Sequence, residues 1–305
     1  MATEMVERTV YLDPALCDGC GLCLKVCPAR AFSLEEGRAV FTGKCSLACD
    51  HCAAVCPRQA IEVEIDKPEP FTFENFMVSA GAASSRPPVD VSGLAALMRQ
   101  RRSCRVYREK PVPLSLLKDL VRMGLTAPSG TNSQALSFTI LPEREKLVDF
   151  GRAIARFYED LNRLAEKAWL RRGLKLCRRP ELDLYYREYY ESVKEGLRSW
   201  WEGSDDRLFH GATAAILVSS RPGASCPVED ALLATGNMIL ASETLGLGSC
   251  LIGFAVEALK RDKKIKKIID IPADEKVHAV LALGYPAIRF QRPATRRQVP
   301  IRVVY

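Results

Sequence analysis

The sequence has no long apolar run, no leader segment and no dinucleotide-binding fingerprint. Nowhere in its 305 residues is there the stretch of 18 or more apolar residues that a membrane helix needs. The N-terminal segment MATEMVERTVYLD carries two glutamates and lacks an apolar core, so it is not expected to be a signal peptide. The glycines of residues 246–253 follow the spacing GxGxxxxG and end a predicted helix, whereas the dinucleotide motif is GxGxxG and opens one. These absences argue against a membrane, secreted or Rossmann-type protein and favour the cytoplasm.

Clusters of basic residues with interleaved aromatics, typical of nucleic-acid binding, are also missing. The net charge is +7, but residues 1–66 hold 6 Lys and Arg against 10 Asp and Glu, and the remainder holds 38 against 27. The one dense basic run, KRDKKIKK at residues 260–267, is expected to be the solvated face of a helix. We therefore expect no nucleic-acid partner, and attribute the basic excess to anionic cofactors and to docking on the acidic segment.

Cysteine, by contrast, is abundant, and eight of the twelve fall in two runs that each end in Cys-Pro. The runs are Cys17, Cys20, Cys23 and Cys27, and Cys45, Cys49, Cys52 and Cys56. This is the spacing of bacterial ferredoxins with two 4Fe-4S clusters, in which the last cysteine of each run ligates the other cluster. Cluster one is therefore predicted on Cys17, Cys20, Cys23 and Cys56, and cluster two on Cys45, Cys49, Cys52 and Cys27.

Most of the second cysteine run repeats the first at an offset of 29 residues, which indicates a duplication. Cys45 follows Cys17 by only 28, because three residues (46–48) replace a two-residue gap, and this difference is expected to affect the second cluster. The alternatives are structural zinc, which favours paired Cys-x-x-Cys sites, and disulfides, which need an oxidising compartment. Two complete four-cysteine runs argue against both. His51, inside the second run, is expected to be a solvent-facing loop residue.

Residues 1–66 are expected to form a small ferredoxin-like domain with strands at 9–12, 39–42 and 60–65. Such a domain buries too little apolar surface to fold without its clusters. Residues 67–89 have prolines near both ends and are rich in alanine, serine and glycine between them, so a linker is predicted. Four large apolar residues in its first half, Phe71, Phe73, Phe76 and Met77, are expected to pack on a surface.

Residues 90–305 are expected to form a second domain of the α+β class, a mixed sheet flanked by helices. Helices are predicted at 114–125 and at 228–245, and the long charged region 143–202 is also predicted to be helical. The predicted strands lie at 137–141, 214–219 and 277–283. Residues 185–201 are rich in tyrosine and tryptophan, and their helical spacing favours packing over an active-site lid.

Three segments of the second domain carry its candidate chemistry: RRSCR at 101–105, APSGTNSQ at 127–134 and GLGSCLIGF at 246–254. Alone, each could be an ordinary basic turn, polar loop or glycine turn. In this order they closely resemble the FMN-dependent nitroreductase family, over about residues 91–305. The resemblance implies that family's fold, a bound FMN and a homodimer with FMN at the subunit interface.

The resemblance also implies roles for particular residues. In the family, RRSxR holds the flavin phosphate and pyrimidine edge, PSGxNSQ lies along the ring, GLGSxxxG places a backbone N–H near flavin N5, and a late basic pair completes the phosphate site. The matching residues are Arg101, Arg102, Ser103 and Arg105; Pro128, Ser129, Gly130 and Asn132; Ile252 and Gly253; and Arg296 and Arg297. Gln134 is followed by Ala135, where family members often have proline, so the resemblance does not predict which residues surround the flavin ring.

Joining the two domains predicts a function. Iron–sulfur clusters pass single electrons, whereas FMN can accept one at a time and release two. We therefore expect an oxidoreductase that takes electrons from a low-potential carrier or oxidoreductase and reduces a small organic acceptor: a nitroaromatic, a quinone or an activated alkene. The alternatives are a non-catalytic subunit that relays electrons to a protein partner, and reductive dehalogenation or flavin remodelling. No side chain is assigned as catalytic, and His210 is expected to be structural.

Overall fold

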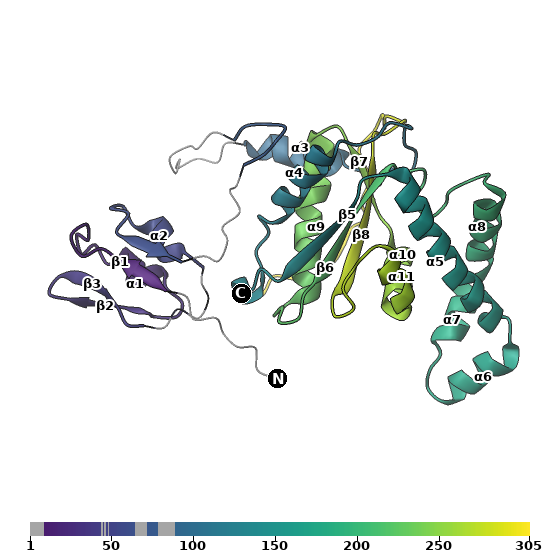
Figure 1. The fold of residues 1–305 in the computed structure, drawn as a ribbon, viewed down its shortest axis with the longest axis horizontal. Coiled ribbons are helices and arrows are strands. Elements are labelled where there is room, and N and C mark those ends of the chain that lie inside the picture. The colour runs from purple at the N-terminus through teal and green to yellow at the C-terminus, as the bar shows by residue number, and fades with distance from the viewer. Residues whose placement is uncertain (1–8, 44, 46, 48, 65–71, 79–88) are drawn as a thin grey trace. The chain divides into compact units, whose positions relative to one another are not determined.

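The computed structural model describes residues 9–43, 45, 47, 49–64, 72–78 and 89–305 (Figure 1). The chain divides into two compact units. The first consists of Met1–Phe71 with two short segments, Pro128–Gln134 and Gly223–Cys226. The second consists of Thr72–Ala127, Ala135–Pro222 and Pro227–Tyr305.

The cysteine-rich part of the first unit contains two small antiparallel sheets and two short helices. Its elements are β1 (Val10–Leu12), α1 (Leu22–Val26), β2 (Phe32–Glu35), β3 (Arg38–Phe41), α2 (His51–Val55) and β4 (Ile61–Val63). β1 pairs with β4, and β2 pairs with β3. The strands predicted near 9–12, 39–42 and 60–65 are confirmed, except that Ile65 lies outside the described residues. The sequence analysis missed β2 and both helices, because each is only four or five residues long.

The duplication predicted from the cysteine spacing is visible in the backbone. α1 and α2 lie 29 residues apart, and each follows a residue in the left-handed region, Gly21 with φ 71° and Asp50 with φ 52°. The residue three beyond each Cys-Pro cysteine is also left-handed, with φ 50° at Arg30 and 52° at Gln59. The two halves therefore share one loop geometry. Ser46 and Ala48, in the longer gap of the second run, lie outside the described residues.

The second unit is a four-stranded sheet with helices on both faces (Figure 1). Its elements are α3 (Val91–Gln100), α4 (Leu114–Gly124), β5 (Leu136–Leu141), α5 (Arg144–Ala165), α6 (Ala168–Leu176), α7 (Glu181–Glu188), α8 (Tyr190–Glu202), β6 (Ala214–Ser220), α9 (Pro227–Thr244), β7 (Gly248–Leu251), α10 (Gly253–Arg261), α11 (Lys263–Ile268) and β8 (Lys276–Gly284). The strand order is β5-β6-β8-β7, and each neighbouring pair is antiparallel. A parallel bridge between Ser103 and Ser249 extends the sheet at β7.

Both faces of the central strand β6 are buried, since successive side chains of a strand point to opposite faces. Ala214, Ile216 and Val218 belong to the core shared with α4 and α9. Ala215 and Leu217 belong to the core shared with α5, α10 and α11. None of the described helices is long and apolar enough to cross a membrane.

Most elements expected in this unit are present, with two differences. The charged region at 143–202 is four separate helices, and breaks at Lys167 and Pro180 divide its first part. The basic run 260–267 is not simply a solvated face, because Ile265 and Lys266 are buried and the Lys266 ammonium donates to the Glu275 carbonyl.

Candidate functional site

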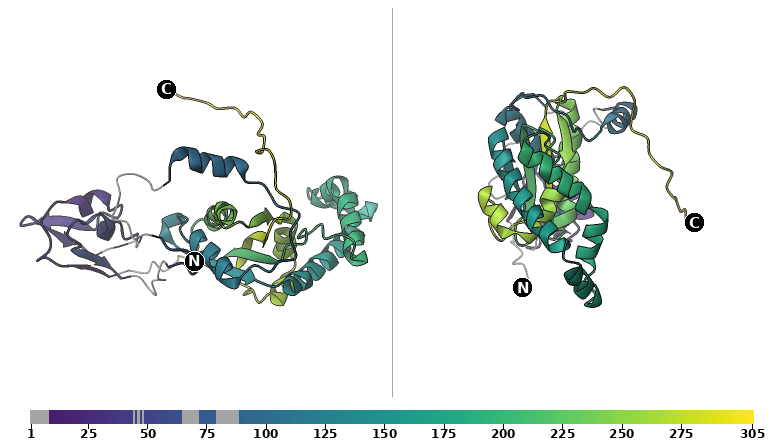
Figure 2. Two further views of the ribbon diagram at one scale, coloured as in Figure 1. Left: turned by 90° about the horizontal axis from the view of Figure 1, so that it is seen from above. Right: turned by 90° about the vertical axis from the view of Figure 1, so that its right-hand side faces the viewer.

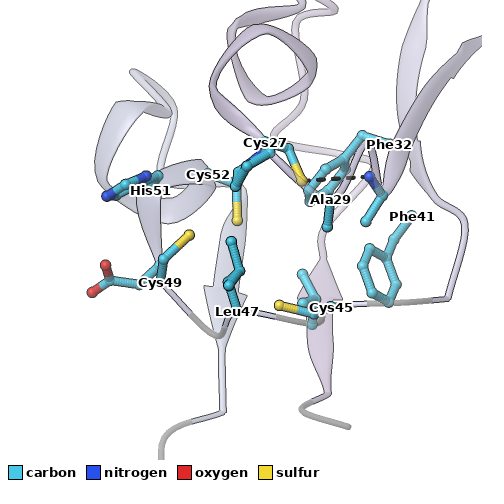
Figure 3. Close-up of a pocket in the computed structure, with 13 residues that line it drawn as sticks. Cys27, Ala29, Phe32, Phe41, Cys45, Leu47, Cys49, His51 and Cys52 are labelled. Carbon is cyan, nitrogen blue, oxygen red and sulfur yellow. Dashed lines mark hydrogen bonds between the residues drawn. The ribbon is translucent and has the colours of Figure 1, made fainter. Parts of the chain in front are cut away.

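The eight clustered cysteines surround two cavities of the first unit. One is lined by Cys27, Cys45, Cys49 and Cys52 (Figure 3). The other is lined by Cys17, Cys20, Cys23 and Cys56. In each cavity three cysteines come from one run and the fourth from the other run. The structure thus groups the cysteines as the crossed ligand pattern predicts.

Backbone amides point at several of these sulfur atoms. The N–H groups of Ala31 and Ala60 donate to Cys27 and Cys56 at 3.4 and 3.3 Å, in equivalent positions of the two halves. The N–H of Ala39 donates to the Cys17 sulfur at 3.4 Å. Hydrogen bonds to the sulfurs are one of the factors that set the potential of an iron–sulfur cluster. The arrangement therefore suits thiolates that carry negative charge.

Each cavity presents four cysteine sulfurs, the ligand set that a 4Fe-4S cluster takes. Burial raises the pKa of the Cys23 thiol and raises that of Cys52 to about 11. Metal coordination would have to displace these protons. His51 is solvent-exposed as expected, but it begins α2 instead of lying in a loop.

In the second unit, the structure brings the Arg101–Arg105 segment alongside strand β7. Ser103 forms the parallel bridge to Ser249, and the Cys104 N–H donates to the Ser249 carbonyl at 2.9 Å. Gly248 makes this approach possible, because a Cβ at that position would lie 2.6 Å from the Cβ of Cys104. Two of the three predicted segments, RRSCR and GLGSCLIGF, are therefore neighbours although about 145 residues separate them.

Arg102 is held by the C-terminal segment of the chain. Its guanidinium donates to the carbonyls of Arg292 and Pro293 at 3.1 and 2.9 Å, and lies 4.9 Å from the ring centroid of Phe290. Its Nε is buried and has no hydrogen-bond partner among the described residues. Arg101 is half-buried and Arg105 is exposed. A buried donor without an acceptor marks this place as one that an anionic group would complete.

Arg296 and Arg297 follow in the same C-terminal segment, and both are exposed. Figure 2 shows this tail, in yellow, running away from the sheet. The tail is tied to the Arg101–Arg105 region by residues 292–294, including a bond from the Ala294 N–H to the Arg99 carbonyl at 3.3 Å. The structure therefore brings the start of the tail to this region, while the predicted basic pair is exposed to solvent.

At the end of β7, only one of the two predicted amides is available. The Ile252 N–H already donates to the Val280 carbonyl at 2.9 Å. Gly253 is exposed and begins α10, where backbone N–H groups have no acceptor within the helix. Of the pair, Gly253 is therefore the amide placed to donate to a bound group.

The third predicted segment, Pro128–Gln134, connects α4 to β5 and contains the short 3₁₀ helix η1 (Gly130–Asn132). Three of its residues are left-handed, with φ 50° at Thr131, 52° at Asn132 and 44° at Gln134. Such conformations are uncommon outside glycine and cluster at functional sites. The Ser133 hydroxyl is a further buried polar group without a hydrogen-bond partner among the described residues. The loop is thus held in an unusual conformation, in agreement with a binding role.

The aromatic segment 185–201 is largely packed, as expected. The Tyr185 hydroxyl donates to Asn162 at 2.7 Å, and the Tyr190 hydroxyl donates to Glu166 at 2.6 Å. Burial raises the pKa of Tyr185, so this phenol stays neutral. Tyr189 differs from these two, because it is half exposed and meets the ring of Phe254 edge-on at 6.1 Å.

Sequence reasoning missed two aromatic residues beside the start of α10. The Tyr158 hydroxyl donates to the Phe254 carbonyl at 2.9 Å, and the two rings meet edge-on at 5.5 Å. The sequence did offer one signal for Phe254, since it directly follows Gly253, a residue of the predicted flavin motif. The half-exposed ring of Phe254, backed by the buried ring of Tyr158, therefore belongs to the residue directly after Gly253.

His210, which was expected to be structural, lies in a turn. Its backbone is left-handed, with φ 58°, and its N–H donates to the Asp206 carbonyl at 2.8 Å. Burial, assisted by the nearby charge of Arg105, lowers the pKa of the imidazole, which is therefore neutral at pH 7. A neutral, partly buried histidine in a hydrogen-bonded turn needs no catalytic explanation.

Both parts of the chain match the models of known protein families. The model of the nitroreductase family matches residues 98–285, and that of the 4Fe-4S binding domain matches residues 10–33. An iodotyrosine deiodinase of Thermotoga neapolitana is 28% identical over 198 residues, which cover 62% of this chain and 87% of the relative. An NADH dehydrogenase of Thermus thermophilus is 28% identical over 206 residues, 66% of this chain and 89% of the relative. The crystal structure of a nitroreductase with bound FMN from Bacteroides fragilis has the same fold, with a TM-score of 0.51 at 22% identity over 70% of this chain and 98% of that one.

Proposed function

The chain belongs to the nitroreductase family and carries a 4Fe-4S binding domain, and from this premise we propose that it is an FMN-dependent reductase with two 4Fe-4S clusters as its electron entry. The acceptor is a small organic molecule: a nitroaromatic, a quinone or an activated alkene. The domains proposed for these tasks are residues 1–66 and 90–305, joined by residues 67–89.

The crossed grouping of the eight cysteines carries the proposal. The 4Fe-4S match covers only the first run. The second run also lines a cavity, with Cys27 as its fourth cysteine. Each cavity offers the four thiolates that a 4Fe-4S cluster takes. We therefore assign cluster one to Cys17, Cys20, Cys23 and Cys56, and cluster two to Cys45, Cys49, Cys52 and Cys27.

For FMN, the proposed contacts are those that the family resemblance implies. Arg101, Arg102 and Ser103 hold the phosphate, because a guanidinium binds phosphate oxygens through a planar fork of donors. Gly253 donates its amide towards flavin N5, since the Ile252 amide is taken by Val280. When bound, FMN would accept electrons singly and deliver them in pairs. Arg105 places a positive charge where the reduced ring is negative.

The remaining assignments to the flavin site are Pro128, Ser129, Gly130 and Asn132 along the ring, with Arg296 and Arg297 near the phosphate. The buried Nε of Arg102 and the buried hydroxyl of Ser133 both need an acceptor or donor that the described residues do not provide. A ligand rich in oxygen and nitrogen atoms, such as FMN, would satisfy them. No titratable side chain is assigned to the chemistry.

The proposed partners are a second copy of the chain and a low-potential electron donor. α3 has no buried residue, and it exposes Val91 and Met98. The tail ends in exposed apolar side chains, among them Ile301 and Val304. Exposed apolar side chains on α3 and on the tail support an interaction site, which a homodimer would cover. A reducing compartment, the cytoplasm, would keep the cluster thiolates intact.

One second function has an observation in its favour. Several relatives at 19–28% identity are iodotyrosine deiodinases. Reductive dehalogenation of an aromatic substrate uses the same kind of reduced flavin, and the exposed rings of Tyr189 and Phe254 suit an aromatic ring. It is therefore the second candidate for the acceptor.

Anaerobic purification followed by reduction and acceptor screening tests the proposal. The protein should hold about eight irons and one FMN per chain, by the ligand count. The reduced protein is then mixed separately with nitroaromatics, quinones, activated alkenes and halogenated phenols. One of these classes should reoxidise it, with reduced product formed in proportion to the protein oxidised. Four irons per chain would remove the second cluster, and bound FAD would remove the FMN assignment. Reoxidation only by a protein partner would favour the electron-relay alternative.

A further inference from the structure

A buried carboxylate of the second unit binds the segment that follows the cysteine-rich module. Asp119, on α4, has a side chain that is 0% exposed. Its oxygens accept the backbone N–H groups of Glu74 and Asn75, both at 2.9 Å, and the Asn75 side-chain amide at 2.8 Å. Two residues of this segment, Glu74 and Asn75, are thereby bonded to a residue of α4 that lies 45 and 44 positions later in the chain.

Further contacts reinforce this attachment. Arg122, one turn along α4, donates to Asp119 at 2.9 Å and to the Glu74 carboxylate at 3.1 Å. The Ser115 hydroxyl donates to the Asn75 side chain at 3.2 Å. The rings of Phe73 and Phe76 stack at 4.4 Å. Asp119, Arg122 and the two amides form a unit that we call the Asp119 clamp.

The clamp matters for the length of chain between the two units. Glu64 is the last described residue of the cysteine-rich module before residue 72, and the two are eight Cα steps apart. Eight steps span at most about 28 Å in any conformation. Without the clamp, the next described helix is α3, whose N-cap Asp90 is 26 steps from Glu64. That length would allow about 90 Å.

We propose that Asp119 is a positioning residue: by clamping Glu74 and Asn75 to α4 it limits the tether of the cluster module to residues 65–71, and so speeds electron delivery from the clusters to the flavin. The kinetic half of this inference rests on the proposed function. The effective concentration of a tethered partner falls roughly as the −3/2 power of tether length. Lengthening the tether from 8 to 26 steps therefore lowers it about sixfold.

The test compares the full-length holoprotein with Asp119→Ala and with Asn75→Pro, which removes donors from the segment and leaves α4 intact. Glu74→Gln is the matched control, because it loses the Arg122 ion pair but keeps both clamping amides. Hydrogen exchange of peptides covering residues 72–78 should accelerate at least tenfold in the first two variants only. The maximum dimension from small-angle scattering should grow in the same two.

Rapid mixing with a reduced carrier supplies the kinetic readout. Cluster-to-flavin transfer should slow about sixfold in Asp119→Ala and Asn75→Pro, whereas direct reduction of the flavin by a small chemical reductant should keep the parent rate. Equal slowing of both reactions would overturn the positioning role in favour of a structural one, as would faster exchange with unchanged transfer. If the parent shows no cluster-to-flavin transfer, the proposed function is wrong. The role of Asp119 in shortening the tether is then tested by scattering alone. A maximum dimension that is the same in the parent, Asp119→Ala and Asn75→Pro would overturn it.

Discussion

Replacing Gly248 by alanine should separate the Arg101–Arg105 segment from strand β7. The added Cβ would lie 2.6 Å from the Cβ and 2.7 Å from the sulfur of Cys104, closer than real Cβ atoms come. The Cβ of Cys104 cannot rotate away, so the backbone has to move and the bond from the Cys104 N–H to Ser249 lengthens. Overpacking costs about 1–3 kcal/mol, and the hydrogen bond adds about 1 kcal/mol. The second unit should lose about 2–4 kcal/mol of unfolding free energy.

Urea unfolding followed by fluorescence, together with the flavin content of the purified protein, measures this effect. Gly236→Ala in α9 is the matched control, because no atom lies within 4 Å of its added Cβ and alanine favours the helix by up to about 1 kcal/mol. In the Gly248→Ala background, Cys104→Gly should restore stability, whereas Cys104→Ala should not, since it keeps the offending Cβ. A Gly248→Ala protein with the parent's midpoint and flavin content would refute the close approach.

Three further predictions follow from the same contacts. Cys56→Ser should remove about half of the iron, and Cys104→Ser, at a cysteine outside the cavities, should remove none; iron assay and electron paramagnetic resonance check both. Arg102→Ala should weaken flavin retention about ten- to a hundredfold, from the loss of a charge-assisted bond worth about 1.5–3 kcal/mol. The same variant should speed trypsin cleavage at the already exposed Arg296, because the tail loses its bonds from Arg102 to residues 292 and 293; unchanged retention and cleavage would contradict this. Burial opposes ionisation of Asp119, but the bonds from Asn75, Glu74 and Arg122 outweigh it and lower the pKa of the carboxyl below 3.8. Its stabilising effect is therefore present above pH 3.8 and is lost as the pH falls through the lowered pKa, a dependence that unfolding midpoints measured from pH 2.5 to 6 should show in the parent and not in Asp119→Ala.

Part of this protein could be predicted from residues close together in sequence. Cysteines separated by two or three residues must lie close together in space, because the chain between them is short. The ligand runs and their duplication could therefore be recognised from the sequence alone. Helix α4 was predicted because its start and its apolar spacing are local signals. Strands β2 and β7 were missed because they are four residues long, and β7 begins at a glycine, which weakens a strand signal.

Contacts between distant residues were decided by the tertiary structure alone. Asp119 looks like a solvent-facing helix residue in sequence, and only the packing of a segment 44 residues earlier explains its burial. Arg102 was predicted as a phosphate ligand, but its bonds to carbonyls 190 residues away could not be foreseen. The Ile252 amide matched the family motif equally well as Gly253, until the pairing with β8 committed it to Val280. Short-range cysteine spacing thus predicted a 4Fe-4S binding domain, and three short motifs predicted the nitroreductase family, whereas the choice among neighbouring backbone donors depended on long-range packing, which no local pattern encodes.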